Sequence, residues 1–183
     1  MMRRVACVIV GLIALASAAC QESQQAPIKE GATAADSADQ VLYHAHYVLT
    51  THGIKRGDLT ADTAYILDDQ TRFDLRKAHV TLTTETGAPQ GTMEADKGMY
   101  STRSQILEGW GNVVVKMVDG RTLLTPHVVF NQVLHTITSD TTFTMTRGSD
   151  SAHGIGFSST PSGHPFNCLR NCGGATSLLL PEK

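Results

Sequence analysis

Three similar stretches decide how this chain folds: GDLTAD at residues 57–62, GTMEAD at 91–96 and GRTLLT at 120–125. Leu59, Met93 and Leu123 occupy the same place in the three copies, which lie 34 and 30 residues apart. Each copy continues through a polar turn into a second strand-like segment and ends in an apolar alternation. A repeat of this length indicates stacked supersecondary units that share one continuous core.

Apolar residues alternate with polar ones in these repeats, as in Leu59/Ala61 and Phe73/Leu75. A period of two residues is typical of strands that bury one face. Beyond Leu42, no stretch keeps the 3.6-residue apolar period of a helix. The sequence therefore predicts an all-β fold. We expect an elongated, twisted antiparallel β-jellyroll built from repeated strand units, in which one long sheet folds over itself.

The composition argues against two classes of protein. The chain has 183 residues, of which 17% are charged and 41% hydrophobic, so it can bury a core and is not a disordered chain. Its formal net charge of −2 argues against nucleic-acid binding, which usually requires an excess of Lys and Arg. Aromatic residues make up only 5%, so the core must come mainly from aliphatic side chains and Met.

The N-terminal residues are typical of a processing signal. Two arginines precede an apolar run of 15 residues, 5–19, which is short for a membrane-spanning helix. Ser17-Ala18-Ala19-Cys20 resembles a bacterial lipobox, in which the cysteine becomes the lipidated first residue of the mature chain. We therefore expect a cleaved lipoprotein signal peptide at 1–19 and a lipid on Cys20. An ordinary signal peptide cut near Ala19 is the alternative.

The rest of the chain divides into three parts. Residues 20–40 are small and polar, and we expect a flexible tether. Residues 41–160 hold the expected β-jellyroll, and residues 161–183 are expected to form an irregular C-terminal tail. The tail contains Cys168 and Cys172. Outside the cytoplasm this pair can oxidise to a disulfide, which closes a small loop and stabilises the fold only modestly.

The chain carries no recognisable enzyme motif: it contains no phosphate loop, no nucleophile elbow and no HExxH sequence. His44 and His46 lie two apart on an expected strand, and without a third ligand we interpret them as an exposed pair. Asp62 and Asp96 occupy equivalent repeat positions, which favours hydrogen bonds to local backbone at turns or strand ends. We expect Trp110 to pack half-buried. The sequence thus predicts a protein that is not an enzyme and that uses no cofactor or metal.

Several of these stretches resemble one known family, in that family's order: residues 59–62 and 93–98, GNVVV at 111–115, DGRTLLT at 119–125, and ITSD at 137–140 followed by GIGF at 154–157. Together they are similar to periplasmic lipopolysaccharide-export proteins of the LptC type, which are related to LptA and to OstA-like domains. The N-terminus departs from that family. LptC proteins commonly keep an uncleaved transmembrane helix, whereas this chain has a lipobox-like sequence.

The resemblance implies a periplasmic component of lipopolysaccharide export. Such a protein would bind the acyl chains of lipopolysaccharide in an apolar groove. It would pass them from an inner-membrane ABC transporter of the LptB/LptF/LptG type to a bridge protein of the LptA type. This role implies that Cys20 anchors the protein at the inner membrane.

The expected groove is lined by the inward-facing residues of the repeats, which are Leu59, Ala61, Phe73, Leu75, Met93, Ala95, Leu107, Val113, Val115, Leu123, Ile137, Phe143 and Phe157. If the sheet closes tightly, the same residues form only a core. The protein is then a structural β-repeat scaffold lipoprotein without a lipid groove. The sequence leaves both interpretations open.

A jellyroll that stays open has two exposed strand edges, to which a neighbouring protein can add a strand. We expect the N-terminal edge near Tyr43–Leu49 to face the transporter. We expect the C-terminal edge near Phe143–Arg147 to face the next bridge protein.

Replacing Cys20 tests the predicted anchor. In Cys20→Ala, metabolic labelling with a fatty acid should disappear, because no thiol remains at the lipobox position to carry the lipid. Cys7→Ala, which lies inside the predicted signal peptide, is the control and should label normally. Labelling that survives in Cys20→Ala would show that the lipoprotein interpretation is wrong.

Overall fold

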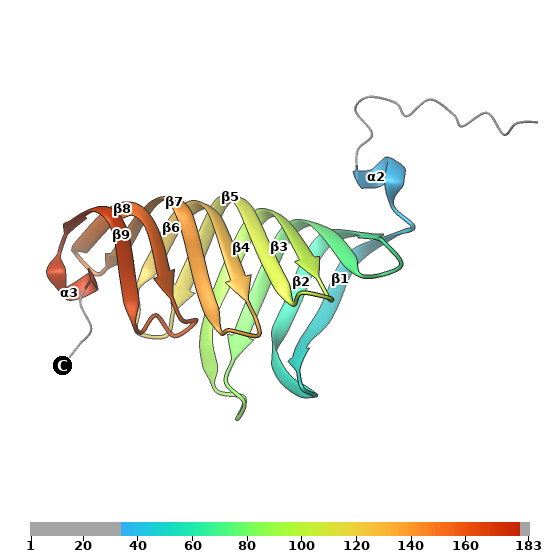
Figure 1. Cartoon of the computed structure of the whole chain (residues 1–183), viewed down its shortest axis with the longest axis horizontal. Coiled ribbons are helices and arrows are strands. Elements are labelled where there is room, and N and C mark those ends of the chain that lie inside the picture. Colours follow the sequence, from blue (N-terminus) through green and yellow to red (C-terminus); the bar gives the residue numbers. More distant parts are fainter. Residues whose placement is uncertain (1–33, 180–183) are drawn as a thin grey trace, which may run out of the picture. The chain divides into compact units, whose positions relative to one another are not determined.

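The computed structural model describes residues 34–179, and these form one antiparallel sheet of nine strands that pair in chain order (Figure 1). The elements are α2 (Ala34–Ser37), β1 (Gln40–Thr51), β2 (Ile54–Leu67), β3 (Arg72–Thr83), β4 (Pro89–Ser101), β5 (Ile106–Met117), β6 (Thr122–Asn131), β7 (Thr136–Arg147), β8 (Asp150–Ser159), β9 (Phe166–Gly174) and α3 (Thr176–Leu179). Because each strand pairs only with its neighbours in the chain, β1 and β9 are the two edges of the sheet. The expected all-β fold is confirmed. The predicted signal peptide, Cys20 and most of the tether lie outside the described residues.

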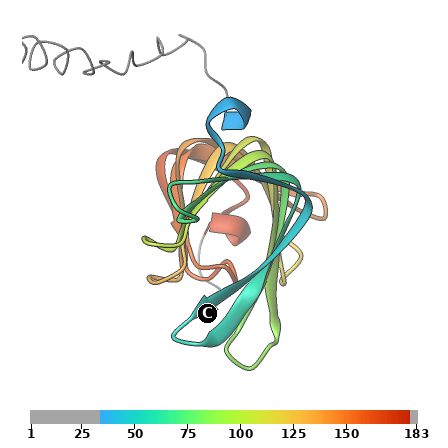
Figure 2. The ribbon, with the colours of Figure 1, turned by 90° about the vertical axis from the view of Figure 1, so that its right-hand side faces the viewer.

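A crease across the middle of the strands folds the sheet over itself. Along the crease the pairing register shifts in successive hairpins, for example between Glu94 and Lys97 and between Trp110 and Val113. Gly111, at the second of these shifts, has a φ of 71°. Bulges of this kind bend a strand and increase its twist. In the end-on view the two halves of the sheet therefore stand as two walls around an interior (Figure 2).

Small residues line the inner side of the crease. Ala61, Ala78 and Ala95 are register partners in β2, β3 and β4, and all three are buried. A Cβ added at Gly98 would lie 3.3 Å from the Cβ of Ala78, and one added at Gly109 would lie 3.1 Å from the Cβ of Ala95. The bend therefore requires small side chains at these positions, because larger ones would collide on its concave side.

Polar side chains bridge neighbouring strands on the solvent side of the crease. Asp96 accepts hydrogen bonds from Lys77 Nζ (2.5 Å) and Asn112 Nδ2 (2.7 Å), which belong to the strands on either side of it. Both hydrogen bonds lower the pKa of Asp96, and the one from Lys77 has the larger effect. The pKa of Lys77 is raised by Asp96 and, to a smaller extent, by the charge of Asp62. The expectation that Asp62 and Asp96 bond local backbone at strand ends is therefore wrong, since both lie within strands, at the crease.

The C-terminal tail is not irregular as expected. Residues Phe166–Gly174 form β9, which pairs with β8, and Thr176–Leu179 form α3. A bulge in β9, where Asn171 has a φ of 50°, interrupts the alternation that marks the other strands. The expected C-terminal edge is also wrong, because Phe143–Arg147 lies in β7, between β6 and β8. The true second edge is β9.

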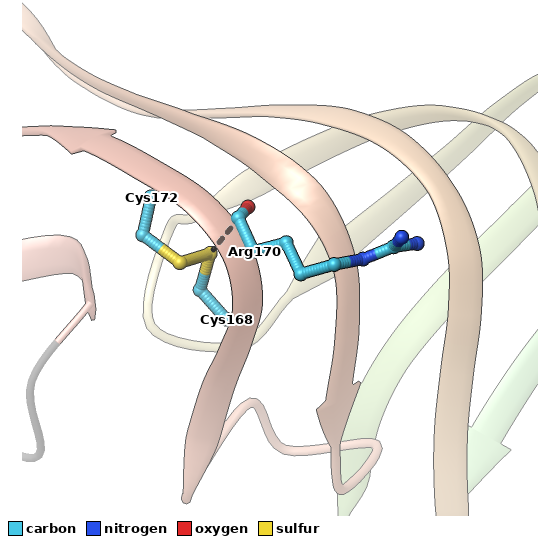
Figure 3. Close-up of a disulfide and its surroundings, with 3 residues drawn as sticks. All are labelled: Cys168, Arg170 and Cys172. Carbon is cyan, nitrogen blue, oxygen red and sulfur yellow. Dashed lines mark hydrogen bonds between the residues drawn. A yellow bond between two sulfur atoms is a disulfide. The ribbon is translucent and has the colours of Figure 1, made fainter.

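Cys168 and Cys172 form a disulfide within β9, with an S–S distance of 1.96 Å (Figure 3). The bridge spans the bulge at Asn171. The sulfur of Cys168 also lies 3.7 Å from the carbonyl oxygen of Arg170, a contact within the same small loop. The sequence separation of the two cysteines is only 4, so the bridge constrains this bulge and little else.

The crease predicts that Gly98 tolerates no branched side chain. A Cβ there would lie 3.3 Å from side-chain atoms of Ala78 and Leu75 and from the carbonyl oxygen of Glu108. Gly98→Val should therefore lower the free energy of unfolding by about 1–3 kcal/mol, measured by urea denaturation. Thr144→Val, at an exposed strand position, is the control and should change it by less than about 0.5 kcal/mol. Equal stability of the two variants would contradict the crowding argument.

Candidate functional site: an apolar interior

The candidate functional site is the interior between the two walls. Of the residues predicted to line it, all but Phe73 are buried in one apolar cluster, and Phe73 packs partly exposed against that cluster. The cluster also contains residues that the prediction missed: Leu49, Ala64, Ala78, Val80, Leu82, Tyr100, Met117, Val128, Phe130, Met145, Ala152, Phe166 and Leu178. Several of these carry the same alternation signal, as Val80 and Leu82 do. Phe166 and Leu178 carry none, because they lie in the segment that shows no strand pattern.

The N-terminal end of the interior is open to solvent. A small cavity of about 40 Å³ lies there between β1, β2 and β3, and its lining side chains are Leu42, Ala45, His46, Tyr47, Leu59, Ala61, Ala64, Phe73 and Leu75. Leu42 is 38% exposed and Tyr47 is 37% exposed, so apolar surface faces water at this end. The cavity is too small for an acyl chain unless the side chains around it move.

Three aromatic rings stand next to this cavity. The ring of Tyr47 lies 5.5 Å from that of Phe73 and 5.4 Å from that of Tyr100, between centroids. Tyr47 comes from the edge strand β1, whereas Phe73 and Tyr100 are register partners in β3 and β4. Burial, and then the neighbouring Tyr47, raises the pKa of Tyr100 to about 12. The Tyr47 ring lies at the open end. Because it rotates about two side-chain bonds, it is suited to move aside for an apolar ligand.

The turns at the ends of the strands form two rows, which we call the rims of the interior. Because every strand crosses the crease, successive turns lie on opposite rims. We call the line where the two rims meet the seam. Near the N-terminal end Gln132, 1% exposed, ties the seam. Its Nε2 donates to the carbonyl oxygen of Thr50 (2.8 Å) and to Thr51 Oγ1 (2.9 Å), and its Oε1 accepts from the Tyr100 hydroxyl (3.3 Å). Gln105 Nε2 adds a bond of 3.2 Å to the same Thr50 oxygen.

Arg121 ties the seam near the C-terminal end. Only 3% of this residue is exposed, and its Nη2 donates to the carbonyl oxygen of Gly163 (2.6 Å) on the opposite rim. Its Nη1 donates to the carbonyl oxygen of Leu178 in α3 (3.4 Å), and its Nε donates to Asp119 (2.5 Å). Burial alone would raise the pKa of Asp119, but the hydrogen bonds and charge of Arg121 outweigh it, and the pKa is lowered. The buried guanidinium is thus paired and hydrogen-bonded on several sides, as burial of a charge requires.

The remaining sequence candidates lie away from the interior. His44 and His46 are both exposed on β1, and His46 bonds Asp58 at 3.0 Å, whereas His44 has a φ of 52°. Trp110 is half-buried, as expected, and stacks on His127 with 5.5 Å between ring centroids. No group of three or more possible metal ligands occurs within residues 34–179.

The fold and its interior define a class: elongated β-jellyroll proteins whose single sheet encloses a continuous apolar interior. The family model for lipopolysaccharide-assembly, LptC-related proteins matches residues 6–170, and the chain belongs to this family. No curated protein matches the chain. Among the described residues no helix has the length and apolar character needed to cross a membrane. The protein thus has a role in lipopolysaccharide transport, which this family carries out in the periplasm and at the inner membrane.

The tie at Gln132 generates a testable prediction. Gln132→Ala should lower the free energy of unfolding by about 1–3 kcal/mol, because it leaves the buried partners of this amide unsatisfied. Hydrogen exchange at the end of β1 should accelerate, since Thr50 and Thr51 lose their link to the opposite rim. Gln105→Ala is the control. It removes a hydrogen bond to the same Thr50 oxygen, but this bond is more exposed to solvent, so the effect on both measurements should be smaller. Identical behaviour of the two variants would show that Gln132 does not hold the seam.

Proposed function

We propose that this protein binds the acyl chains of lipopolysaccharide in its interior. It passes the lipid from an inner-membrane ABC transporter of the LptB/LptF/LptG type to a bridge protein of the LptA type. The observation that supports this most is the apolar cluster itself, which receives side chains from every strand, β1 to β9, without interruption. A continuous apolar path along a single sheet suits a cargo that slides and does not suit one that is held at a fixed point.

The energetics of chain burial agree with a carrier. Burying a dozen methylenes supplies on the order of 10 kcal/mol before the costs of ordering are subtracted. The interior side chains must also move, because they now fill most of the space that the chain would take. Met93, Met117 and Met145 lie among them and adapt easily to a changed neighbour. Both costs lower the net affinity, and a protein that must release its cargo needs a modest affinity.

The two sheet edges are the proposed docking surfaces. β1 would accept a strand from the transporter, and β9 would accept one from the bridge protein. Leu169 on β9 is 59% exposed, and Tyr43 on β1 is 74% exposed, so each edge also offers an apolar side chain to a partner. The lipid on Cys20 would hold the protein at the inner membrane, and the tether would let β1 reach the transporter.

A scaffold without a groove is the alternative. It is favoured by the close packing of the interior, in which most lining side chains are almost fully buried. In that case the apolar cluster acts only as a core, and the edges alone carry the function.

Photocrosslinking in living cells separates the two functions. A photoreactive amino acid at Phe73, beside the open end, should form an adduct with lipopolysaccharide, whereas one at the outward Tyr65 should not. Leu42→Asp places a charge in the lining of the cavity and should abolish the Phe73 adduct while the fold survives, because Leu42 is already 38% exposed.

Val48→Asp is the matched control for this experiment. Val48 is 42% exposed on the same strand but does not line the cavity, so the Phe73 adduct should persist in this variant. Absence of any adduct at Phe73 in the otherwise unchanged protein, with circular dichroism of a folded sheet, would favour the scaffold.

A further inference from the structure

The two ends of the interior differ. The N-terminal end exposes apolar side chains, whereas the C-terminal end is closed by the chain itself. After β9 the backbone reverses at Gly174 and leads into α3, which lies between the walls in the end-on view (Figure 2). Of the strands, α3 contacts β7, β8 and β9.

Gly174 allows this reversal. Its φ is +105°, and a Cβ there would lie 2.3 Å from the carbonyl oxygen of Ser151 and 2.6 Å from the Cα of Ala152. No other residue fits such a position without strain and a collision with the backbone of β8. The chain is therefore built to turn back over the end of the sheet.

Leu178 is the part of α3 that enters the interior. Its side chain is 0% exposed and belongs to the same apolar cluster as Phe143 and Met145 of β7. Ala175 and Leu179 pack partly buried against that cluster, whereas Ser177 faces solvent. The Leu178 side chain thus lies among the residues proposed to contact acyl chains.

Among residues 34–179, hydrogen bonds tie α3 and the residue before it to Arg121 and to the start of β8. Arg121 donates to the carbonyl oxygen of Leu178 across 3.4 Å, the longest of the bonds made by this guanidinium. The amide of Ala175 donates to Ser151 (2.8 Å), and the Ser177 hydroxyl donates to Asp150 (3.1 Å) at the surface. α3 follows the last pair of the β8–β9 ladder, Ala152 with Gly174, so its four residues lie outside that pairing.

We propose that α3 is an internal plug: it occupies the distal end of the interior and must withdraw before the cargo can reach the β9 edge. The proposal rests on the function proposed above. A single leucine buries fewer methylene groups than an acyl chain, so a chain that advances from the open end displaces it. Until then the plug keeps the distal end of the interior from water and closes it to apolar molecules other than the cargo.

Crosslinking at both ends of the interior tests the plug in the full chain. In the unmodified sequence a photoreactive residue at Phe73 should give a stronger lipopolysaccharide adduct than one at Phe143. Leu178→Asp should raise the Phe143 adduct about tenfold, which corresponds to a shift of ~1.4 kcal/mol between plugged and open states, and leave the Phe73 adduct unchanged. Ser177→Asp, on the solvent side of the same helix, is the control and should change neither adduct.

A second variant guards against loss of the fold. A stop codon after Ala175 removes the plug and leaves β9 whole, and it should raise the Phe143 adduct as Leu178→Asp does. The proposal is wrong if the Phe143 adduct matches the Phe73 adduct before any change, if neither variant alters it, or if both variants unfold. No adduct at Phe73 in any protein would instead overturn the proposed function, and the plug with it.

Discussion

A sheet with one apolar face must cover that face, and the rest of this structure depends on that constraint. Residues 34–179 contain two helices, and each has only four residues, too few to form a covering layer. The second half of each strand therefore covers the first half. The bulges, the small residues inside the crease and the polar bridges outside it all follow from this one bend.

A sheet that folds over itself has two kinds of boundary, the rims formed by its turns and the edges formed by its first and last strands, and the two differ in this structure. The rims are joined by buried polar side chains, chiefly Gln132 and Arg121, whereas the edge strands β1 and β9 each pair on one side only within the described part of the chain. Hydrogen bonds between the rims are directional, and neighbouring ones strengthen one another. Separating the two rims would therefore require these buried hydrogen bonds to break.

Most of the fold was predictable from the alternation of apolar residues, because within each wall successive side chains still point alternately inward and outward. Leu59, Val113 and Ile137 are buried for this reason. The alternation changes phase at the crease in several strands: in β4 the buried Met93 and Ala95 are followed by the buried Tyr100. What escaped prediction depends on contacts between distant residues. Gln132 bonds a carbonyl oxygen 82 residues away, and no local pattern marks that pairing. β9 was missed because the bulge at Asn171 breaks its alternation. Since the whole C-terminal segment was expected to be irregular, Phe166 and Leu178 were not predicted to line the interior.

The pairing of each strand with its chain neighbours alone has a consequence for how such a protein grows. Duplication of a hairpin inserts two strands in the middle of the sheet and disturbs only the ladders at the insertion point. The interior becomes longer while its cross-section, set by strand length and by the position of the crease, stays the same. Evolution can therefore adjust the reach of this architecture in whole hairpins, and each addition can fold against the neighbour that precedes it.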